Sequence, residues 1–203
     1  MIKSKEEYRE NIKRDTIHYW RTKTKCKIFG DEVWKFIIQL RKKEYYTSFS
    51  GMKKMIMLPA IVWNKYLFRR YSNLCGFTIP INVCEKGIAL PHRGTIVINT
   101  TARIGENCRI HQGVSIGSTN GSKKSAIIGK NVFIGSGAQI IGEVIIEDDV
   151  AIGANAVVTR SILEKGTTWG GIPAKKISDK NSHMNLCPRL FGEKREKVSH
   201  NEN

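Results

Sequence analysis

The sequence is poor in cysteine, in acidic side chains and in long apolar runs, and each shortage excludes a class of protein. Its five cysteines are odd in number and form no Cys-x-x-Cys pair, which argues against a disulfide framework and against a structural zinc site. The start, residues 1–6, is polar and shows no secretory signal, so we expect a cytoplasmic protein with reduced thiols. The longest apolar run, 55–63, contains Pro59 and is too short to span a bilayer.

Acidic residues are few relative to basic ones, and the imbalance is uneven along the chain. The chain has 34 Lys and Arg against 18 Asp and Glu, a formal net charge of +16, and residues 1–75 hold 18 of the basic and 7 of the acidic side chains. This basic region is either a solvated helical face or a contact for an anionic glycan or a membrane surface. The last reading would place the protein peripherally at the inner face of the membrane. No nucleic-acid-binding module is recognisable, so we expect no nucleic-acid partner.

Aromatic residues make up only 8% of the chain, but all six tyrosines and three of the four tryptophans lie within residues 1–75. In the same region, apolar residues at 33, 36, 37 and 40 follow the spacing of an amphipathic helix, with Gly30 or Asp31 as its start. A second helical stretch covers residues 63–70, and Gly76 marks the change to another pattern. We therefore predict an N-terminal α-helical region over residues 1–75.

From residue 96 onward, an aliphatic side chain recurs at every sixth position, and a small or apolar residue lies two positions before each. A period of six fits neither an α-helix nor an amphipathic strand. It predicts a solenoid of short strands and tight turns, in which one hexad forms one face and three hexads form a coil. The recurring residues are Ile98, Ile104, Ile110, Ile116, Ile128, Ile134, Ile140, Ile146, Ile152 and Val158.

Three hexads per coil predict that Ile98, Ile116 and Ile134 stack one above another, in about four coils over residues 78–160. Only Ser122 breaks the series, within the polar, glycine-rich insert 117–125. We expect the insert to replace one hexad and to protrude as a loop, and such loops often border a site. Residues 179–203 show no period and should be flexible. The expected domains are 1–75, 76–177 and a flexible tail over 178–203.

Two motifs carry a resemblance to a known family. The segment Leu90-Pro91-His92-Arg93-Gly94-Thr95-Ile96-Val97-Ile98, the hexads, the loop and Gly171-Ile172-Pro173-Ala174-Lys175 resemble the serine acetyltransferase branch of the hexapeptide-repeat acyltransferases. They look more similar still to branch members of capsule and exopolysaccharide pathways. The resemblance covers about residues 76–177. It implies a mainly β fold, a left-handed parallel β-helix after the N-terminal helical region, with acetyl-CoA as co-substrate and no metal. It also implies a homotrimer, with a dimer of trimers as an open alternative.

Acyl transfer from a thioester to a hydroxyl needs a general base, and histidine suits that role near neutral pH. Only His92 and His111 lie in the solenoid, and both are catalytic candidates. The resemblance implies that His92 deprotonates the acceptor, whereas the plain alternative is a corner histidine bonded to a backbone carbonyl. The resemblance also implies that glycines of the last coils and the closing segment bind coenzyme A, with lysines pairing its phosphates. The expected contacts are Gly117, Gly135, Ser136, Gly153, Ala154, Gly171, Lys175 and Lys176.

Two departures from the serine-acting enzymes bear on the acceptor. The aspartate that orients the base in those enzymes falls at Phe77, and their second histidine falls at Ser125. We therefore expect an acetyl-CoA-dependent O-acetyltransferase that acts on a hydroxyl of a sugar or surface-polysaccharide precursor, with serine as the alternative acceptor. Glu85, a backbone carbonyl or a neighbouring subunit would then orient His92. A non-catalytic scaffold is a remote alternative, and a γ-type carbonic anhydrase is disfavoured because no His-x4-His pair is present.

Overall fold

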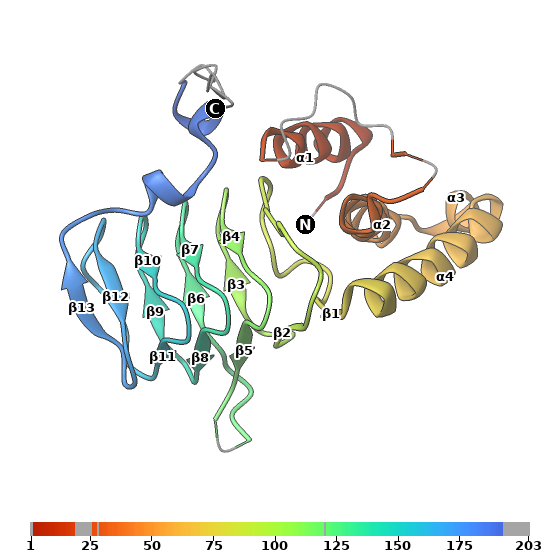
Figure 1. The fold of residues 1–203 in the computed structure, drawn as a ribbon. Helices are drawn as coiled ribbons and strands as arrows, with labels where there is room; N and C mark the ends of the chain where they lie inside the picture. The colour runs from red at the N-terminus through yellow and green to blue at the C-terminus, as the bar shows by residue number, and fades with distance from the viewer. Residues whose placement is uncertain (1, 19–25, 28, 120, 193–203) are drawn as a thin grey trace.

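The computed structural model describes residues 2–18, 26–27, 29–119 and 121–192, and it has two parts. Figure 1 shows four helices at one end of a column of short strands. The predicted helical stretches around residues 33–40 and 63–70 both lie in helices, which confirms an N-terminal helical region. The helices are α1 (Lys5–Ile17), α2 (Glu32–Tyr46), α3 (Gly51–Ile56) and α4 (Leu58–Cys75).

Local sequence sets the ends of these helices. Ser4 Oγ accepts a hydrogen bond from the Glu7 backbone N–H at 3.0 Å, which satisfies one free donor in the first turn of α1. Gly76 ends α4 in the left-handed conformation, with φ 75°, which glycine adopts without strain. Asp31 precedes α2 as expected, but its side chain caps no N–H of that helix. It accepts a hydrogen bond from the Lys27 backbone N–H instead.

The strands wind into a parallel β-helix with three faces. Face A contains β1, β2, β5, β8 and β11; face B contains β3, β6 and β9; and face C contains β4, β7, β10, β12 and β13. Every pairing is parallel except that of β12 with β13. The strands are β1 (Phe77–Thr78), β2 (Ile96–Ile98), β3 (Arg103–Ile104), β4 (Arg109–Ile110), β5 (Ser115–Gly117), β6 (Ile127–Ile128), β7 (Phe133–Ile134), β8 (Gln139–Ile141), β9 (Ile145–Ile146), β10 (Ala151–Ile152), β11 (Val157–Val158), β12 (Thr168–Gly170) and β13 (Lys175–Ser178).

The six-residue aliphatic series forms the core of this β-helix. All ten recurring residues are buried, with at most 3% of any side chain exposed. Burying an isoleucine or valine side chain contributes about 1.5–3 kcal/mol, so the stacked aliphatics dominate the stability of the column. The period of six thus predicts both the strands and their buried positions correctly.

The predicted ladder is wrong at its third member. Ile98 pairs with Ile116 as expected, but Ile116 then pairs with Ile140 on face A. Ile134 lies on face C, paired with Ile110 and Ile152. The reason is that the glycine-rich insert is extruded in addition to the three hexads of its coil, rather than replacing one. Figure 1 shows the resulting loop projecting away from the column beyond β5.

The irregular segment 77–95 closes a complete first coil. Strand β1 pairs with β2, and isolated bridges join Cys84 to Ile104 and Ala89 to Arg109. Face A therefore carries one strand from each of five coils, one more than we expected. The first coil, which lies within the expected span, matters because it carries His92.

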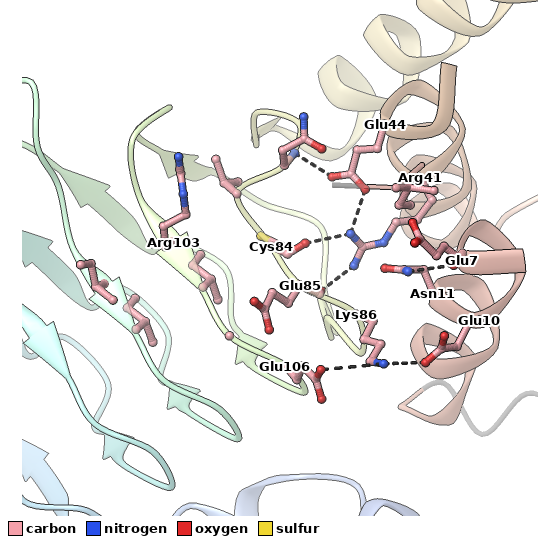
Figure 2. Close-up of a pocket in the computed structure, with 17 residues that line it drawn as sticks. Glu7, Glu10, Asn11, Arg41, Glu44, Cys84, Glu85, Lys86, Arg103 and Glu106 are labelled. Carbon is pink, nitrogen blue, oxygen red and sulfur yellow. Dashed lines mark hydrogen bonds and ion pairs between the residues drawn. The ribbon is translucent and has the colours of Figure 1, made fainter. Parts of the chain in front are cut away.

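A buried arginine joins the helical region to this first coil. Arg41 in α2 is 1% exposed and pairs with Asp15 at 2.9 Å and with Glu44 at 3.0 Å. Its guanidinium also donates to the Cys84 and Glu85 carbonyls at 2.8 and 2.7 Å, as Figure 2 shows. Burial lowers the pKa of Arg41, but the two carboxylates outweigh burial and hold that pKa above its usual value. This charged network adds to the apolar packing of α2 on the first coil, which includes the contact of Phe36 with Phe77.

The segment after β13 packs along the column. Leu186 and Cys187 are buried, Ser182 Oγ donates to the Asn131 carbonyl, and Cys187 Sγ lies 3.4 Å from the Ile17 carbonyl of α1. Two apolar side chains in this segment are thus packed on the rest of the chain, and the flexibility that we expected after residue 177 stays a prediction. Residues 193–203 lie outside the described residues. The division at 75 and 177 stays a prediction.

Candidate active site

Most of the predicted site residues lie on one edge of the β-helix, where the chain passes from face C to face A. His111, Gly135 and Gly153 directly follow β4, β7 and β10, and Gly171 directly follows β12. These four strands are successive neighbours on face C, and His92 follows the bridge of Ala89 to Arg109 one coil earlier. We call this line the C/A edge. With coils about 4.8 Å apart, it extends roughly 19 Å from His92 to Gly171.

His92 lies at the helical end of the C/A edge, in the turn before β2, and its side chain is exposed. Its ring centroid is 5.8 Å from that of His111, in an edge-to-face arrangement. Across residues 2–18, 26–27, 29–119 and 121–192, no protein group is hydrogen-bonded to the His92 ring. The backbone-bonded corner histidine that we considered as the plain alternative is therefore absent from the described residues. Both ring nitrogens of His92 can meet a bound molecule.

His111 is held differently. Arg109 Nε donates a hydrogen bond to His111 Nε2 at 3.2 Å, so this nitrogen acts as the acceptor and the ring proton resides on Nδ1. Burial, followed by the charges of Arg109 and His92, lowers the pKa of His111. The ring also packs edge-to-face on Phe133 at 5.1 Å. His111 is thus a neutral, fixed ring whose basic nitrogen is already engaged, which makes His92 the better general base.

A small pocket of opposite charges opens beside His92. It has a volume of about 350 Å³ and is lined by the start of α2 and by the His92 turn, at residues Asp31, Glu32, Val33, Trp34, Pro91, His92 and Arg93. Glu32 Oε2 lies 4.0 Å from Arg93 Nη1. Asp31 and Glu32 are not among the site residues predicted from the sequence. The only signal was an acidic pair at a predicted helix start within an otherwise basic region.

The glycines of the C/A edge differ in what the fold demands of them. A Cβ added at Gly135 would lie 2.7 Å from the Ala154 backbone nitrogen of the next coil, so coil stacking alone requires glycine there. A Cβ at Gly153 would lie 3.4 Å from its nearest neighbour, the Trp169 carbonyl oxygen, which is an ordinary contact. Ser136 and Ala154, the next residues along the chain, lie on the same edge. The edge therefore offers a narrow surface of small side chains.

Three expected coenzyme A contacts are not part of the C/A edge itself, although Lys175 pairs with Gly170 beside its far end. Gly117 ends β5 on face A, at the base of the extruded loop. Lys175 and Lys176 belong to β13, and with Trp169 and Pro173 they line a pocket of about 640 Å³ at the last coil. Lys176 Nζ is ion-paired with Glu164 and Asp179, while none of the described carboxylates pairs with Lys175. Lys175 is therefore the cation more available to a phosphate.

The side chains of Phe77 and Ser125, which replace the aspartate and the second histidine of the serine-acting enzymes, and that of Glu85 do not lie in the His92 pocket. Phe77 is 2% exposed and packs edge-to-face on Phe36 at 5.1 Å. Ser125 is 4% exposed, and its Oγ has no partner among the described residues. Glu85 lines a separate pocket of about 580 Å³ around Arg41, on the side of face B (Figure 2). The expectation that Glu85 orients His92 is therefore wrong, because the two side chains line different pockets.

In the described part of the chain, no group of three or more His, Cys, Asp or Glu side chains is placed to hold a metal ion.

Comparison with known sequences identifies relatives across most of the chain. The family described as Bacterial transferase hexapeptide (six repeats) matches residues 125–160. A serine acetyltransferase of Staphylococcus epidermidis is 36% identical over 179 residues, which covers 78% of this chain and 81% of that protein. A serine acetyltransferase of Helicobacter pylori is 35% identical over 120 residues, 56% of this chain and 70% of that protein.

Solved structures show the same fold at lower identity. The crystal structure of Neisseria gonorrhoeae serine acetyltransferase matches 96% of this chain and 74% of its own, with a TM-score of 0.64 at 21% identity. Soybean serine acetyltransferase matches 85% of this chain and 69% of its own, with a TM-score of 0.65 at 23% identity. A serine acetyltransferase of Brucella abortus in complex with coenzyme A matches 87% of this chain and 70% of its own, with a TM-score of 0.64 at 21% identity. These matches confirm the fold class, an N-terminal helical region followed by a hexapeptide-repeat β domain.

Proposed function

The chain belongs to the serine acetyltransferase family of hexapeptide-repeat transferases, and we propose that its acceptor is the hydroxyl group of L-serine. It is an acetyl-CoA-dependent O-acetyltransferase. The relatives named above support serine, our alternative acceptor, better than the sugar hydroxyl that we favoured from Phe77 and Ser125. The identity of 36% over 78% of the chain is the observation that carries the proposal.

The charged pocket beside His92 fits an amino acid. Free serine carries an ammonium group and a carboxylate a short distance from its hydroxyl. Glu32 supplies a negative charge and Arg93 a positive charge on the wall of the pocket that also contains His92. Such a pair can recognise both charged groups of serine at once, whereas a neutral sugar would leave both charges without a ligand partner. This arrangement supports serine independently of the relatives.

His92 acts as the general base in this proposal. It accepts the proton of the serine hydroxyl while that oxygen attacks the thioester carbonyl carbon, so that the C–O bond forms as the O–H bond breaks. His92 then returns the proton to the sulfur as the C–S bond breaks, which yields the acetyl ester and coenzyme A without an acyl-enzyme. His111 keeps a neutral ring beside His92, so no second positive charge opposes protonation of the base.

The C/A edge is our proposed path for coenzyme A. Gly135, Ser136, Gly153, Ala154 and Gly171 present little side-chain bulk along this edge, and Lys175 offers a cation near its far end. A ligand that extends along the edge would bring its thioester to His92 and its phosphates towards the last coil. The two pockets described near this edge lie at its ends, beside His92 and at the last coil, so we also propose a homotrimer in which a second subunit covers the ligand between them. Whether trimers pair further stays open.

A sugar hydroxyl remains the second candidate acceptor, because two specific residues favour it. Phe77 occupies the position of the orienting aspartate, and its side chain is buried in the core. Ser125 occupies the position of the second histidine, and it is also buried. Neither side chain can contact a serine molecule in the pocket. The serine proposal therefore requires Glu32 and Arg93 to replace those contacts.

Release of coenzyme A thiol, measured with purified protein, acetyl-CoA and one acceptor at a time, tests the proposal. L-serine should give saturable thiol release and O-acetylserine, whereas nucleotide-activated sugars should give only background. Glu32→Gln should raise the apparent KM for L-serine at least about tenfold, because it removes the charge facing the ammonium group, and should leave the KM for acetyl-CoA unchanged. Saturable transfer to a sugar, with none to serine, would select the second candidate.

A further inference from the structure

A large apolar surface is exposed on the two helices that lead into the first coil. Its seven side chains have exposed fractions from 52 to 76%, and they lie on α3 and on the first half of α4: Met52, Met55, Ile56, Leu58, Val62, Trp63 and Tyr66. Isolated exposed apolar residues are ordinary, but a contiguous patch of this size usually marks an interaction site. We call this set the α3–α4 face.

On α4, the α3–α4 face is the apolar side of an amphipathic helix. Leu58, Val62 and Tyr66 are four residues apart and therefore lie on one line along α4. Asn64, on the opposite side of the helix, is buried and donates hydrogen bonds to the Gln39 backbone and side chain in α2. Figure 1 shows α4 at the outer side of the helical region, with α2 packed on it and the strand column beyond. In the described chain, nothing covers the outer side of α4.

The charge around this face has one sign. Residues 45–84 contain no Asp or Glu, and their five cations are Lys53, Lys54, Lys65, Arg69 and Arg70. On a helical projection, Lys65 and Arg69 lie along one border of the apolar line on α4, and Arg70, four residues after Tyr66, continues that line at its C-terminal end. Burial, followed by the charge of Lys65, lowers the pKa of Lys43 at the end of α2. The α4 part of the surface is thus apolar in its middle and cationic along one border and at its C-terminal end.

We propose that the α3–α4 face docks on the anionic surface of a lipid membrane. An apolar strip flanked by Lys and Arg is the pattern of a helix that lies in the headgroup region. Trp63 and Tyr66, whose rings stack at 5.4 Å, have the apolar body and polar edge that suit this interface. No helix within the described ranges is long and apolar enough to cross a bilayer, so the contact is peripheral.

The charge pattern also distinguishes this occupant from a second copy of the chain. Two α3–α4 faces brought together would set five cations against five, with no carboxylate on residues 45–84 of either copy to offset them. Repulsion between like charges would oppose such a dimer. A lipid surface supplies the missing negative charge and accepts the apolar side chains at the same time. The inference concerns a different surface from the His92 pocket and does not depend on the identity of the acceptor.

Flotation of the full chain with lipid vesicles tests the proposal. One set of vesicles contains phosphatidylcholine alone, and the other is an equimolar mixture of phosphatidylcholine and phosphatidylglycerol. The parent protein should float only with the anionic vesicles, and less at high salt. Replacing Lys65, Arg69 and Arg70 by Gln should weaken binding roughly 100-fold. Val62→Ser with Trp63→Ser should also weaken it, without changing the charge.

The matched control removes three exposed cations from α1, where Glu6, Glu7 and Glu10 lie among them: Lys5→Gln, Arg9→Gln and Lys13→Gln. This variant has the same net charge as the first and should bind anionic vesicles within about threefold of the parent. Failure of the parent to bind them, or an equal loss in the control, would overturn the proposal. The proposal would also be overturned if light scattering showed that the α3–α4 variants form smaller oligomers than the parent, because the face would then be an interface between copies.

Discussion

Replacing Arg41 by methionine should destabilise the protein strongly, because the guanidinium serves four acceptors at once. The change leaves the Asp15 and Glu44 carboxylates, 0% and 2% exposed, without their cation. It also removes the donor from two carbonyls of the first coil. Loss of one partner from a buried ion pair typically costs about 3–5 kcal/mol.

The remaining contacts place the expected cost near the lower end of that range. Asp15 keeps hydrogen bonds from the Gly87 and Ile88 backbone N–H groups at 2.7 and 3.0 Å, and Glu44 keeps one from Asn82 at 2.8 Å. We therefore expect a loss of about 3 kcal/mol in the free energy of unfolding. With a urea m-value of about 2 kcal/mol/M, the unfolding midpoint should fall by about 1.5 M.

The control is Lys86→Met, which removes an ion pair from the same joint between helices and coil. Lys86 and its partner Glu10 are 31% and 60% exposed, so the pair is largely screened by solvent and its loss should cost less than about 1 kcal/mol. Urea unfolding followed by circular dichroism measures both variants. A loss of less than about 1 kcal/mol for Arg41→Met, or equal losses for the two variants, would refute the argument that burial makes the Arg41 network matter.

Three further predictions concern the C/A edge, the phosphate end and a buried histidine. Gly153→Ala should keep the free energy of unfolding within about 1 kcal/mol of the parent value but raise the KM for acetyl-CoA. Gly135→Ala, in contrast, should lower the melting temperature because its Cβ meets the next coil. An unchanged KM in Gly153→Ala would remove this edge from the coenzyme A path. Lys175→Ala should raise the KM for acetyl-CoA more than Lys176→Ala does, because Lys176 is already ion-paired, and equal effects would contradict this. Burial, helped by the charges of Arg109 and Arg14, lowers the pKa of His18 from 6.5 to about 4. The unfolded chain therefore takes up a proton at a higher pH than the folded chain, and the free energy of unfolding should fall by roughly 3 kcal/mol from pH 7 to pH 4. His18→Gln should show a correspondingly shallower decline in unfolding scans over that range.

The repeat explains why the strands of the column and their buried positions could be predicted from the sequence. A strict period of six fixes which residues face inward and which fall at a corner. The residues after Ile110, Ile134 and Ile152 share one edge only because the insert is additional to the hexads of its coil. The roles expected for His92 and for the glycines of that edge came from the resemblance to the serine acetyltransferase branch, because the segment that carries His92 keeps the repeat poorly. The period could not say whether the insert replaces a hexad or adds to the coil, because both leave the same gap at Ser122. The stack of Ile134 on Ile116 failed for that reason.

Contacts between segments that lack the six-residue repeat could not be predicted from the sequence. Glu32 and Arg93 are far apart in the chain and meet because the helices dock on the first coil through the Arg41 network and through apolar packing. The segment after β13 has no periodicity, and its packing depends on two apolar side chains, Leu186 and Cys187. These contacts depend on non-local docking, which local propensity and spacing do not encode.

The rate of acetyl transfer by His92→Ala tests the central claim most directly. Steady-state rates with saturating acetyl-CoA and L-serine should fall by about 10²–10⁴-fold relative to the parent, since a single general base contributes that much. His111→Ala should lose far less, and calorimetry should show that His92→Ala binds coenzyme A as the parent does. A His92→Ala variant that turns over serine at nearly the parental rate would contradict the assignment of His92 as the base, and with it our account of the C/A edge as the place of reaction.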